Sequence, residues 1–229
     1  MSPAASVSHS AARTVRVVTH DVTLTGDLTV PDDARGIVVF AHGSGSSRLS
    51  PRNRQVAAWL QRSQLATLLL DLLSPEEDAH DRGTAEFRFD ITLLARRLHD
   101  ATEWLATQPD TRDLPIGYFG ASTGAAAALV AAAQLGDHIA AVVSRGGRPD
   151  LAGQYLAHVV APTLFIVGQR DPVVLDLNIT AQQSLRGESN LRLVPGATHL
   201  FEEPGALEIV GALAKEWFVR HLTRHAVAA

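Results

Sequence analysis

Short, continuously apolar runs recur along this chain, and segments with helical periodicity separate them. Runs of this kind are typical of strands in a parallel sheet, because helices cover both faces of such a sheet and leave no polar side. They predict strands at residues 36–41, 65–73, 114–120, 139–144, 162–168 and 190–196. Ahead of these, alternating apolar and polar residues at 14–18 and 22–30 predict two further strands at a sheet edge.

Helical patterns fill the intervals between these runs. Ser50 and Pro51 suit the cap and the first position of a helix. An apolar stripe at spacings of three and four, from Ile91 to Leu105, indicates an amphipathic helix. The predicted helices cover about residues 50–63, 85–106, 176–186 and 205–224. Because no long linker interrupts the alternation, it predicts a single, doubly wound α/β domain over residues 13–229, after a loose tail at 1–12.

The composition narrows the classes of function. The 229 residues are 46% hydrophobic and 19% charged with a net charge of −4, which is typical of a globular protein and gives no reason to expect nucleic acid as a partner. The absence of cysteine excludes disulfides, thiolate metal sites and a cysteine nucleophile. The apolar runs are too short to span a bilayer, and the first residues lack a signal-peptide pattern. We therefore expect a cytoplasmic monomer or homodimer without a membrane partner.

One serine stands where the strand pattern ending at Gly120 gives way to an alanine-rich helical pattern. Residues 120–124 read GASTG, which fits G-x-S-x-G in the strand-to-helix context that this motif requires. So sharp a turn needs an unusual backbone conformation that costs about 1–3 kcal/mol, and small neighbours allow it to close. The pattern predicts Ser122 as a nucleophile, and the alternative interpretation is an ordinary glycine-rich turn.

A serine hydroxyl needs a base to remove its proton and an acid to orient that base. In this type of fold the acid and the histidine should follow later strands, in that order, because sites lie beyond the carboxyl ends of the strands. Asp171 and His199 each come just after a predicted strand and in the required order. The sequence therefore predicts a Ser122–His199–Asp171 triad, with Asp176 or Asp150 as alternative acids.

The glycine-rich segment HGSGSS follows the strand at 36–41 and completes the predicted site. A tetrahedral intermediate needs hydrogen-bond donors aimed at its oxyanion. We expect the backbone amide of Thr123 to be one donor and that of Ser44 to be the other, with Gly43 as the alternative. His42 is expected to shape the loop rather than to act as a base. The spacing of the glycines fits neither a dinucleotide fingerprint nor a phosphate-binding P-loop.

With HGSG after the third predicted strand and GASTG after the fifth, the sequence resembles the α/β-hydrolase superfamily over about residues 14–222. Within it, the segments HGSGSSRLSPRN and VVSRGGRPDL are similar to those of small bacterial members of the dienelactone hydrolase-like group, some of which are fused to phosphoribosyltransferase domains. The resemblance implies an α/β-hydrolase fold, with a mostly parallel eight-stranded sheet, helices on both faces and no cap domain. Dienelactone hydrolases use a cysteine where this chain has Ser122, so the resemblance implies general ester hydrolysis rather than dienelactone cleavage.

Only residues 145–161 separate the sixth and seventh predicted strands, so we expect an open, shallow site. Arg145 and Arg148 lie on this connection, where either could bind a substrate carboxylate bidentately. The alternative is a structural ion pair, for example with Asp150. The charge run at 74–82 is interpreted as a solvated loop rather than a metal site, because its carboxylates and histidine lack a strong ligand pattern.

These observations predict a serine carboxylesterase without cofactor or metal, which cleaves a small carboxylic ester or lactone through an acyl-enzyme. Two other functions remain open from the sequence. The same triad could pass its acyl group to an alcohol or an amine, which would make the protein an acyltransferase. The fold could also serve a non-catalytic, ligand-binding protein, because a fold alone does not establish an activity.

Overall fold

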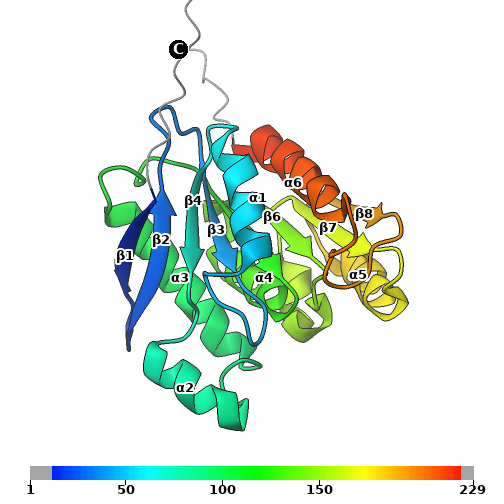
Figure 1. The fold of residues 1–229 in the computed structure, drawn as a ribbon, viewed down its shortest axis with the longest axis horizontal. Helices are drawn as coiled ribbons and strands as arrows, with labels where there is room; N and C mark the ends of the chain where they lie inside the picture. The colour runs from blue at the N-terminus through cyan, green and yellow to red at the C-terminus, as the bar shows by residue number, and fades with distance from the viewer. Residues whose placement is uncertain (1–11, 223–229) are drawn as a thin grey trace, which may run out of the picture.

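The sheet at the centre of the molecule has eight strands in the order β1-β2-β4-β3-β5-β6-β7-β8 (Figure 1). The computed structural model describes residues 12–222, so nearly all of the expected loose tail at 1–12 lies outside the described residues. Strands β3 to β8 run parallel, whereas β2 is antiparallel to both β1 and β4. The strands are β1 (Arg13–Val18), β2 (Thr23–Thr29), β3 (Ile37–Ala41), β4 (Ala66–Leu70), β5 (Ile116–Ala121), β6 (Ile139–Arg145), β7 (Thr163–Gly168) and β8 (Ser189–Val194). The predicted sheet is confirmed, whereas the single domain over 13–229 stays a prediction.

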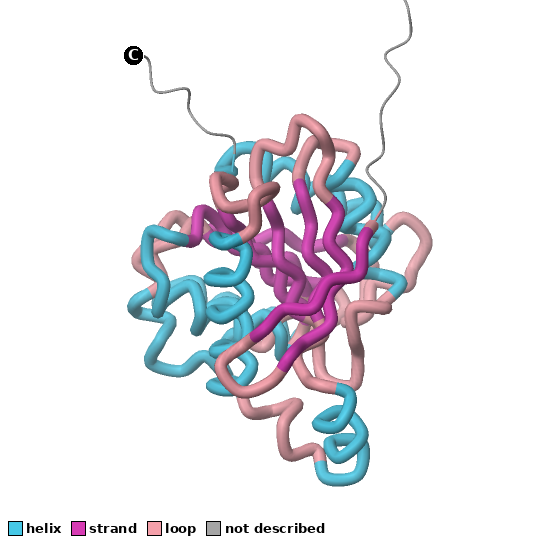
Figure 2. The backbone as a smooth tube through the Cα atoms, turned by 90° about the vertical axis from the view of Figure 1, so that its left-hand side faces the viewer, coloured by secondary structure: helices cyan, strands magenta, loops and turns pink. Residues whose placement is uncertain are grey.

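Helices cover both faces of the sheet, as predicted (Figure 2). Helices α3, α4 and α5 pack on one face, and α1 and α6 pack together on the other. The helices are α1 (Pro51–Gln61), α2 (Pro75–Thr84), α3 (Ile91–Thr107), α4 (Thr123–Leu135), α5 (Pro172–Ser184) and α6 (Ala206–Leu222), with 3₁₀ segments at Gly136–His138 and Pro149–His158. Only the second 3₁₀ segment lies between β6 and β7, which confirms that no cap domain is inserted there. Within residues 12–222, no helix is long and apolar enough to cross a membrane.

Helix α4 is the most deeply buried of the described helices, and its position determines where Ser122 lies. Its sequence is mainly alanine, and most of its residues are fully covered. Small side chains allow a helix to lie close to a sheet, and the apolar area that they remove from water stabilises that arrangement. Because Ser122 is the residue that precedes α4, the packing of this helix against β5 also determines where the serine lies.

The charge run at 74–82 forms helix α2, so its interpretation as a solvated loop was wrong. Ser74 and Glu77 make a reciprocal capping box: the Ser74 hydroxyl accepts the Glu77 amide at 3.2 Å, and the Glu77 carboxylate accepts the Ser74 amide at 2.8 Å. Pro75 stands at the first helical position, where it costs no hydrogen bond. The signature of serine followed three residues later by glutamate is readable in the sequence. Helix α2 projects from the body of the molecule below the sheet (Figures 1 and 2).

Helices α3 and α5 begin at other residues than the sequence predicts. Helix α3 begins at Ile91 rather than near 85, because the Asp90 carboxylate caps it by accepting the amide of Leu93 at 2.9 Å. Helix α5 begins at Pro172 rather than near 176, with Pro172 in its first turn and Asp171 at its cap position. A proline at the start of a helix is favourable, and its amide would have had no partner there in any case.

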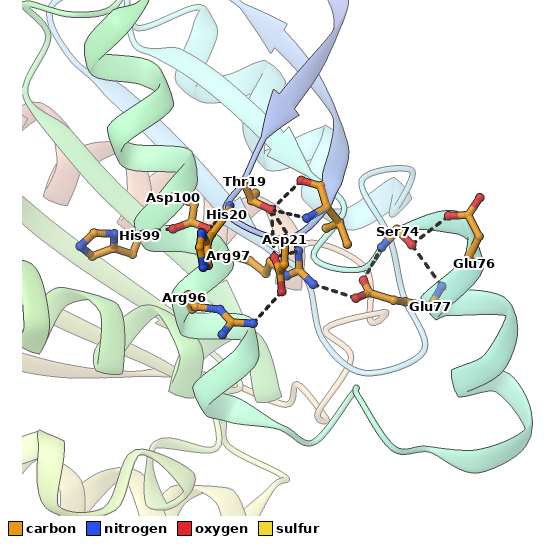
Figure 3. Close-up of polar contacts among 11 residues, drawn as sticks. Thr19, His20, Asp21, Ser74, Glu76, Glu77, Arg96, Arg97, His99 and Asp100 are labelled. Carbon is orange, nitrogen blue, oxygen red and sulfur yellow. Dashed lines mark hydrogen bonds and ion pairs between the residues drawn. The ribbon is translucent and has the colours of Figure 1, made fainter.

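A buried arginine on α3 ties the arm formed by α2 to the edge of the sheet (Figure 3). Arg97 is 0% exposed, and its guanidinium donates to Thr19 at 3.0 Å, to Asp21 at 2.6 Å and to Glu77 at 2.7 Å. Burial raises the pKa of Asp21, but the charges of Arg97 and Arg96 outweigh it and hold that pKa below its usual value. The turn between β1 and β2, α3 and the first turn of α2 are therefore joined through one cation.

Candidate active site

Ser122 occupies the turn between β5 and α4 with a backbone conformation that a side chain rarely adopts. Its φ is 51° and its ψ is −121°, which is strained for any residue other than glycine. Its amide donates to the carbonyl of Arg145 at 3.2 Å, and its carbonyl accepts the amides of Ala125 and Arg148, each at 3.1 Å. These bonds hold the strained backbone in place. The side chain is half-buried, and its hydroxyl has no hydrogen-bond partner among the described residues.

His199 and Asp171 are in direct contact. Nδ1 of His199 lies 2.7 Å from Oδ2 of Asp171, and since a carboxylate only accepts, Nδ1 is the donor, so that in the neutral ring Nε2 is the acceptor. Asp171 follows β7, and His199 lies in the connection between β8 and α6. Asp150 instead binds Arg148 at 2.7 and 2.9 Å, and Asp176 has no described contact with His199. Of the three acids considered from the sequence, Asp171 is therefore the partner of the histidine.

The histidine lies beside the end of β6, the strand next to the one that carries Ser122. A Cβ atom added at Gly146 would meet the His199 carbonyl oxygen at 3.2 Å and its ring Cε1 at 3.5 Å. Gly146 directly follows Arg145, whose carbonyl binds the Ser122 amide. The predicted triad members thus gather at the carboxyl ends of β5, β7 and β8. The structure contains no hydrogen bond between Ser122 and His199, and in unliganded sites such bonds are often long.

A carboxylate that the sequence analysis overlooked holds the loop that carries His199. Oε1 of Glu203 accepts both the amide of Thr198 at 3.0 Å and its hydroxyl at 2.6 Å. The hydroxyl of Thr198 is the main cause that lowers the pKa of Glu203 below its usual value. The same loop contains Phe201, which has a φ of 55° although it is not glycine. The clasp between Glu203 and Thr198 therefore stabilises a strained loop directly beside the histidine.

Replacing Glu203 by alanine should lower kcat about tenfold and leave KM nearly unchanged, because His199 would lose its fixed orientation while the substrate contacts remain. Glu203→Gln keeps an acceptor oxygen for Thr198 and should restore most of kcat. Steady-state kinetics of both variants test this expectation. Equal losses of kcat in the two variants, or a change confined to KM, would contradict a positioning role for the clasp.

The loop after β3 takes its shape from His42. Leu72 donates its amide to Nε2 of His42 at 3.0 Å, so the ring proton must be on Nδ1, which lies 3.0 Å from the carbonyl of Gly43. Burial lowers the pKa of His42, and its hydrogen bond to Gly43 and the nearby carboxylates of Asp71 and Asp78 only partly offset this. His42 is therefore neutral with both ring nitrogens occupied, which agrees with its predicted role in shaping the loop.

The amides expected to form the oxyanion hole lie together, but one of them is already occupied. The amide of Ser44 donates to the side-chain hydroxyl of Thr123 at 2.9 Å. The amides of Gly43 and Thr123 have no acceptor within residues 12–222. A Cβ atom added at Gly43 would lie 3.1 Å from the Cβ of Ser122, so this loop directly adjoins the serine. In this state, Gly43 and Thr123 are the open donors, and Ser44 becomes available only when the Thr123 hydroxyl turns away.

Helix α2 closes one side of this loop. A pocket between them is lined by residues of the loop and by Asp78, Asp81 and Arg88, and its water-accessible volume is only about 20 Å³, room for about one water molecule. Asp81 is 3% exposed and accepts the amides of Phe87 and Arg88 and the Nε of Arg88 at 2.6–3.0 Å. Arg88 is therefore engaged in holding the segment after α2 and is not free to bind a substrate.

The two arginines proposed from the sequence have different surroundings. Arg148 forms the two parallel bonds to Asp150 described above, which favours the structural alternative for this residue. Arg145 is 7% exposed, and its guanidinium carbon lies 5.6 Å from the centre of the Phe201 ring. Among the described residues, the guanidinium of Arg145 has neither a hydrogen bond nor an ion pair.

One group of side chains in the described part of the chain has the spacing of a metal site. Ligand atoms of His99, Asp100 and Glu103 lie within 4.8 Å of one another on α3. Asp100 already accepts the amide of His20 at 3.1 Å (Figure 3). Glu103 is exposed. The group lies on a helix that packs against the sheet and not on the loops around Ser122, so it takes no part in the candidate site.

Comparison with known proteins relates most of this chain to one family. A model of the dienelactone hydrolase family matches residues 24–220. Two curated proteins of Mycobacterium tuberculosis, from strains CDC 1551 / Oshkosh and ATCC 25618 / H37Rv, are each named a putative phosphoribosyl transferase and are 63% identical to this chain over 208 residues. The match covers 91% of this chain and 46% of each relative. The chain therefore spans about half the length of the curated relatives it matches.

Solved structures share the fold over nearly their full length. A crystal structure of a dienelactone hydrolase from Anabaena variabilis is 56% identical, with a TM-score of 0.91 over 93% of this chain and 98% of that one. Est1E from Butyrivibrio proteoclasticus is 16% identical, with a TM-score of 0.76 over 91% and 98%. A dienelactone hydrolase-like promiscuous phosphotriesterase, P91, from metagenomic libraries is 18% identical, with a TM-score of 0.75 over 93% and 99%. At their low identity, the last two show similarity of fold alone.

Proposed function

This chain belongs to the dienelactone hydrolase family, and on that premise we propose that it is a serine hydrolase that cleaves small carboxylic esters or lactones. The observation that carries the proposal is the 2.7 Å contact between His199 Nδ1 and Asp171 Oδ2, at the same end of the sheet as the strained Ser122. The sequence contains no cysteine, so a thiol cannot be the nucleophile. The 56% identical dienelactone hydrolase of Anabaena variabilis supports hydrolysis as the type of reaction.

The reaction proceeds through an acyl-enzyme. The hydroxyl oxygen of Ser122 attacks the carbonyl carbon of the ester while its proton moves to Nε2 of His199. Collapse of the tetrahedral intermediate breaks the bond to the alcohol, which leaves with the proton from Nε2. A water molecule then attacks the acyl group, gives its proton to Nε2 and releases the acid, and Ser122 recovers its proton. In a lactone the leaving alcohol stays attached to the acyl group until water opens the acyl-enzyme.

Asp171 keeps the imidazole in the tautomer that the first step needs. Its carboxylate accepts the Nδ1 proton, which leaves Nε2 free to take the proton of the serine. When Nε2 becomes protonated, the adjacent negative charge of Asp171 stabilises the imidazolium. The proton stays on the imidazole and does not pass to Asp171.

Backbone amides stabilise the oxyanion of the intermediate. The amide of Thr123 and the open amide of Gly43 are the first pair of donors, because neither has an acceptor among the described residues. The amide of Ser44 can join them once the Thr123 hydroxyl releases it. The start of α4 adds the positive end of a helix dipole at the same place.

We do not propose the phosphoribosyl transferase activity for which the mycobacterial relatives are named. Those proteins are about twice as long as the matched segment, and the name describes the whole protein. The matched segment contains the residues discussed above, so we propose hydrolase chemistry for it. Transfer of the acyl group to an alcohol or amine would use the same triad, and product analysis in the presence of added nucleophiles distinguishes it from hydrolysis.

Labelling with a fluorophosphonate tests the proposed nucleophile. The purified protein should form a covalent phosphonyl adduct on the peptide that contains Ser122, and Ser122→Ala should form none. Ser184→Ala, which removes an exposed hydroxyl on α5, is the matched control and should react like the unaltered protein. Hydrolysis of 4-nitrophenyl esters by the same samples should follow the labelling. Adduct formation or hydrolysis that persists in Ser122→Ala would refute the proposal.

A further inference from the structure

The loop after β6 holds the backbone of Ser122 from two sides. The carbonyl of Arg145 accepts the Ser122 amide at 3.2 Å, and the amide of Arg148 donates to the Ser122 carbonyl at 3.1 Å. Residues 146 and 147, which join these two contacts, are both glycine. Glycine restricts the backbone less than any other residue. The strained conformation of Ser122 therefore depends on how firmly this two-glycine connection is held by the elements around it.

Each of the two glycines is bound by a different element. The amide of Gly146 donates to the carbonyl of Ile166 on β7 at 2.8 Å. The carbonyl of Gly147 accepts Nδ2 of Asn178, a residue of α5, at 3.0 Å. The backbone is also closely packed here, because a Cβ atom added at Gly147 would lie 2.7 Å from the Cβ of Ala125 in α4. Asn178 therefore ties this loop to α5 by a side-chain hydrogen bond.

The side-chain amide of Asn178 is buried and can point only one way. It is 0% exposed, and its Nδ2 also donates to the carbonyl of Val174, one turn earlier on α5, at 2.7 Å. Both neighbours are carbonyl oxygens, so only the NH₂ group can bind them. The Oδ1 atom is left without a hydrogen-bond partner among the described residues. A buried polar atom without a partner costs free energy, and leucine has a similar shape without that cost, so packing alone does not account for an amide at this position.

The same helix carries the acid of the proposed triad. Asp171 is the cap residue of α5, but its carboxylate accepts no amide of the helix and binds His199 instead. Asn178 lies about two turns further along, a spacing that puts two residues on one side of a helix. One helix thus contacts both the histidine and the loop that holds the serine.

We propose that Asn178 is a positioning residue for the reaction at Ser122. It fixes Gly147, and through Arg148 the backbone of Ser122, relative to the helix that carries Asp171. The proposal rests on the proposed function and adds to it a residue that acts through the loop after β6. Displacement of a reacting group by about 1 Å can cost about 100-fold in rate, so one hydrogen bond to a flexible connection is enough to affect the chemistry.

Asn178→Leu tests this role, because leucine has a similar shape and lacks the donor. We expect kcat for a 4-nitrophenyl ester to fall about 10- to 100-fold with little change in KM, and labelling by a fluorophosphonate to slow by a similar factor. Thr102→Val is the matched control. Thr102 is also buried, and its hydroxyl bonds to the carbonyl of Leu98, one turn earlier, and to the hydroxyl of Tyr118. Because these contacts do not involve the loop after β6, this variant should keep the kcat of the unaltered protein.

Hydrogen exchange measured by mass spectrometry follows the loop independently of activity. In Asn178→Leu, the peptides that contain the amides of Ser122 and Arg148 should exchange about tenfold faster than in the unaltered protein, whereas peptides from β3 and β4 should be unchanged. Asn178→Ser gives a second measurement in case Asn178→Leu does not fold. Its shorter hydroxyl should bond to the carbonyl of Val174 and leave Gly147 unbound, so the same changes in kcat and exchange are expected.

The outcomes separate this proposal from the proposed function. An unchanged kcat in Asn178→Leu would overturn the positioning role and leave the hydrolase function intact. Faster exchange over the whole chain, with lower stability in urea, would assign Asn178 a purely structural role and would also overturn the proposal. A lower kcat without faster exchange at Ser122 and Arg148 would show that Asn178 acts by another route. If the unaltered protein hydrolyses no ester and Ser122 is not labelled, the hydrolase function fails, and the positioning role fails with it.

Discussion

Replacing His199 by alanine should lower kcat for a 4-nitrophenyl ester by about 10⁴- to 10⁶-fold, because His199 is the proposed base that takes the proton of Ser122. The ring lies on the surface side of the fold and is partly exposed, so its removal should change the free energy of unfolding little. The residual kcat of the variant is measured in assays that run for hours, with the concentration of active enzyme determined separately. Urea denaturation measures its free energy of unfolding. A variant that keeps more than about a tenth of the kcat of the unaltered protein would exclude His199 as the base.

Asp171→Asn tests whether Asp171 acts by orienting His199. An amide can present its NH₂ group to Nδ1 and so favours the tautomer with the proton on Nε2, which cannot accept the proton of the serine. The expected loss in kcat is about 10⁴-fold. The double variant Asp171→Asn/His199→Ala should be no slower than His199→Ala alone, because residues that act as a unit do not contribute additively. Additive losses would show that Asp171 acts other than through His199.

The sequence was sufficient to predict the sheet and the contact between two of the three proposed triad residues, and the physical reasons are simple. Strands covered on both faces are continuously apolar, so their positions and order along the chain can be read directly. Ser122, Asp171 and His199 each follow such a strand, and parallel strands end at the same edge of the sheet. The structure brings His199 and Asp171 into contact as this argument requires. The boundaries of helices α3 and α5 were less accurate, because they depend on individual caps such as Asp90.

Contacts between distant side chains could not be predicted from the sequence. The partner of Arg148 could be named in advance, since Asp150 lies two residues away, but nothing local distinguishes a paired arginine from the unpaired Arg145. The bond from Ser44 to the hydroxyl of Thr123 likewise joins residues that are far apart in the sequence, and it changes which amide is open in the unliganded site. Helix α2 was missed for another reason: a capping box was present, but the charge run led us to expect a loop.

Gly124, the last glycine of the GASTG segment, lies where helix α4 packs closely against the backbone after β3. A Cβ atom at Gly124 would lie 2.3 Å from the carbonyl oxygen of Ala41 and 2.4 Å from that of His42, both backbone atoms that cannot rotate away. Helix α4 could accommodate it only by moving away from β3 and the loop after it. The segment therefore needs glycine here because two backbones meet, and not because of flexibility.

Replacing Gly124 by alanine should therefore lower the free energy of unfolding by about 3 kcal/mol or more, at the upper end of the cost of overpacking. The same substitution at Gly83, an exposed position of α2 with no atom within 4 Å of the added Cβ, should be neutral or raise stability by up to about 1 kcal/mol, because alanine favours the helix. Urea denaturation of both variants measures the two effects. Because the clash at Gly124 involves the loop beside Ser122, the folded fraction of that variant should also lose esterase activity, whereas Gly83→Ala should keep it. Similar stabilities for the two variants would mean that α4 can shift without cost, and the close packing that positions Ser122 would then lose its physical basis.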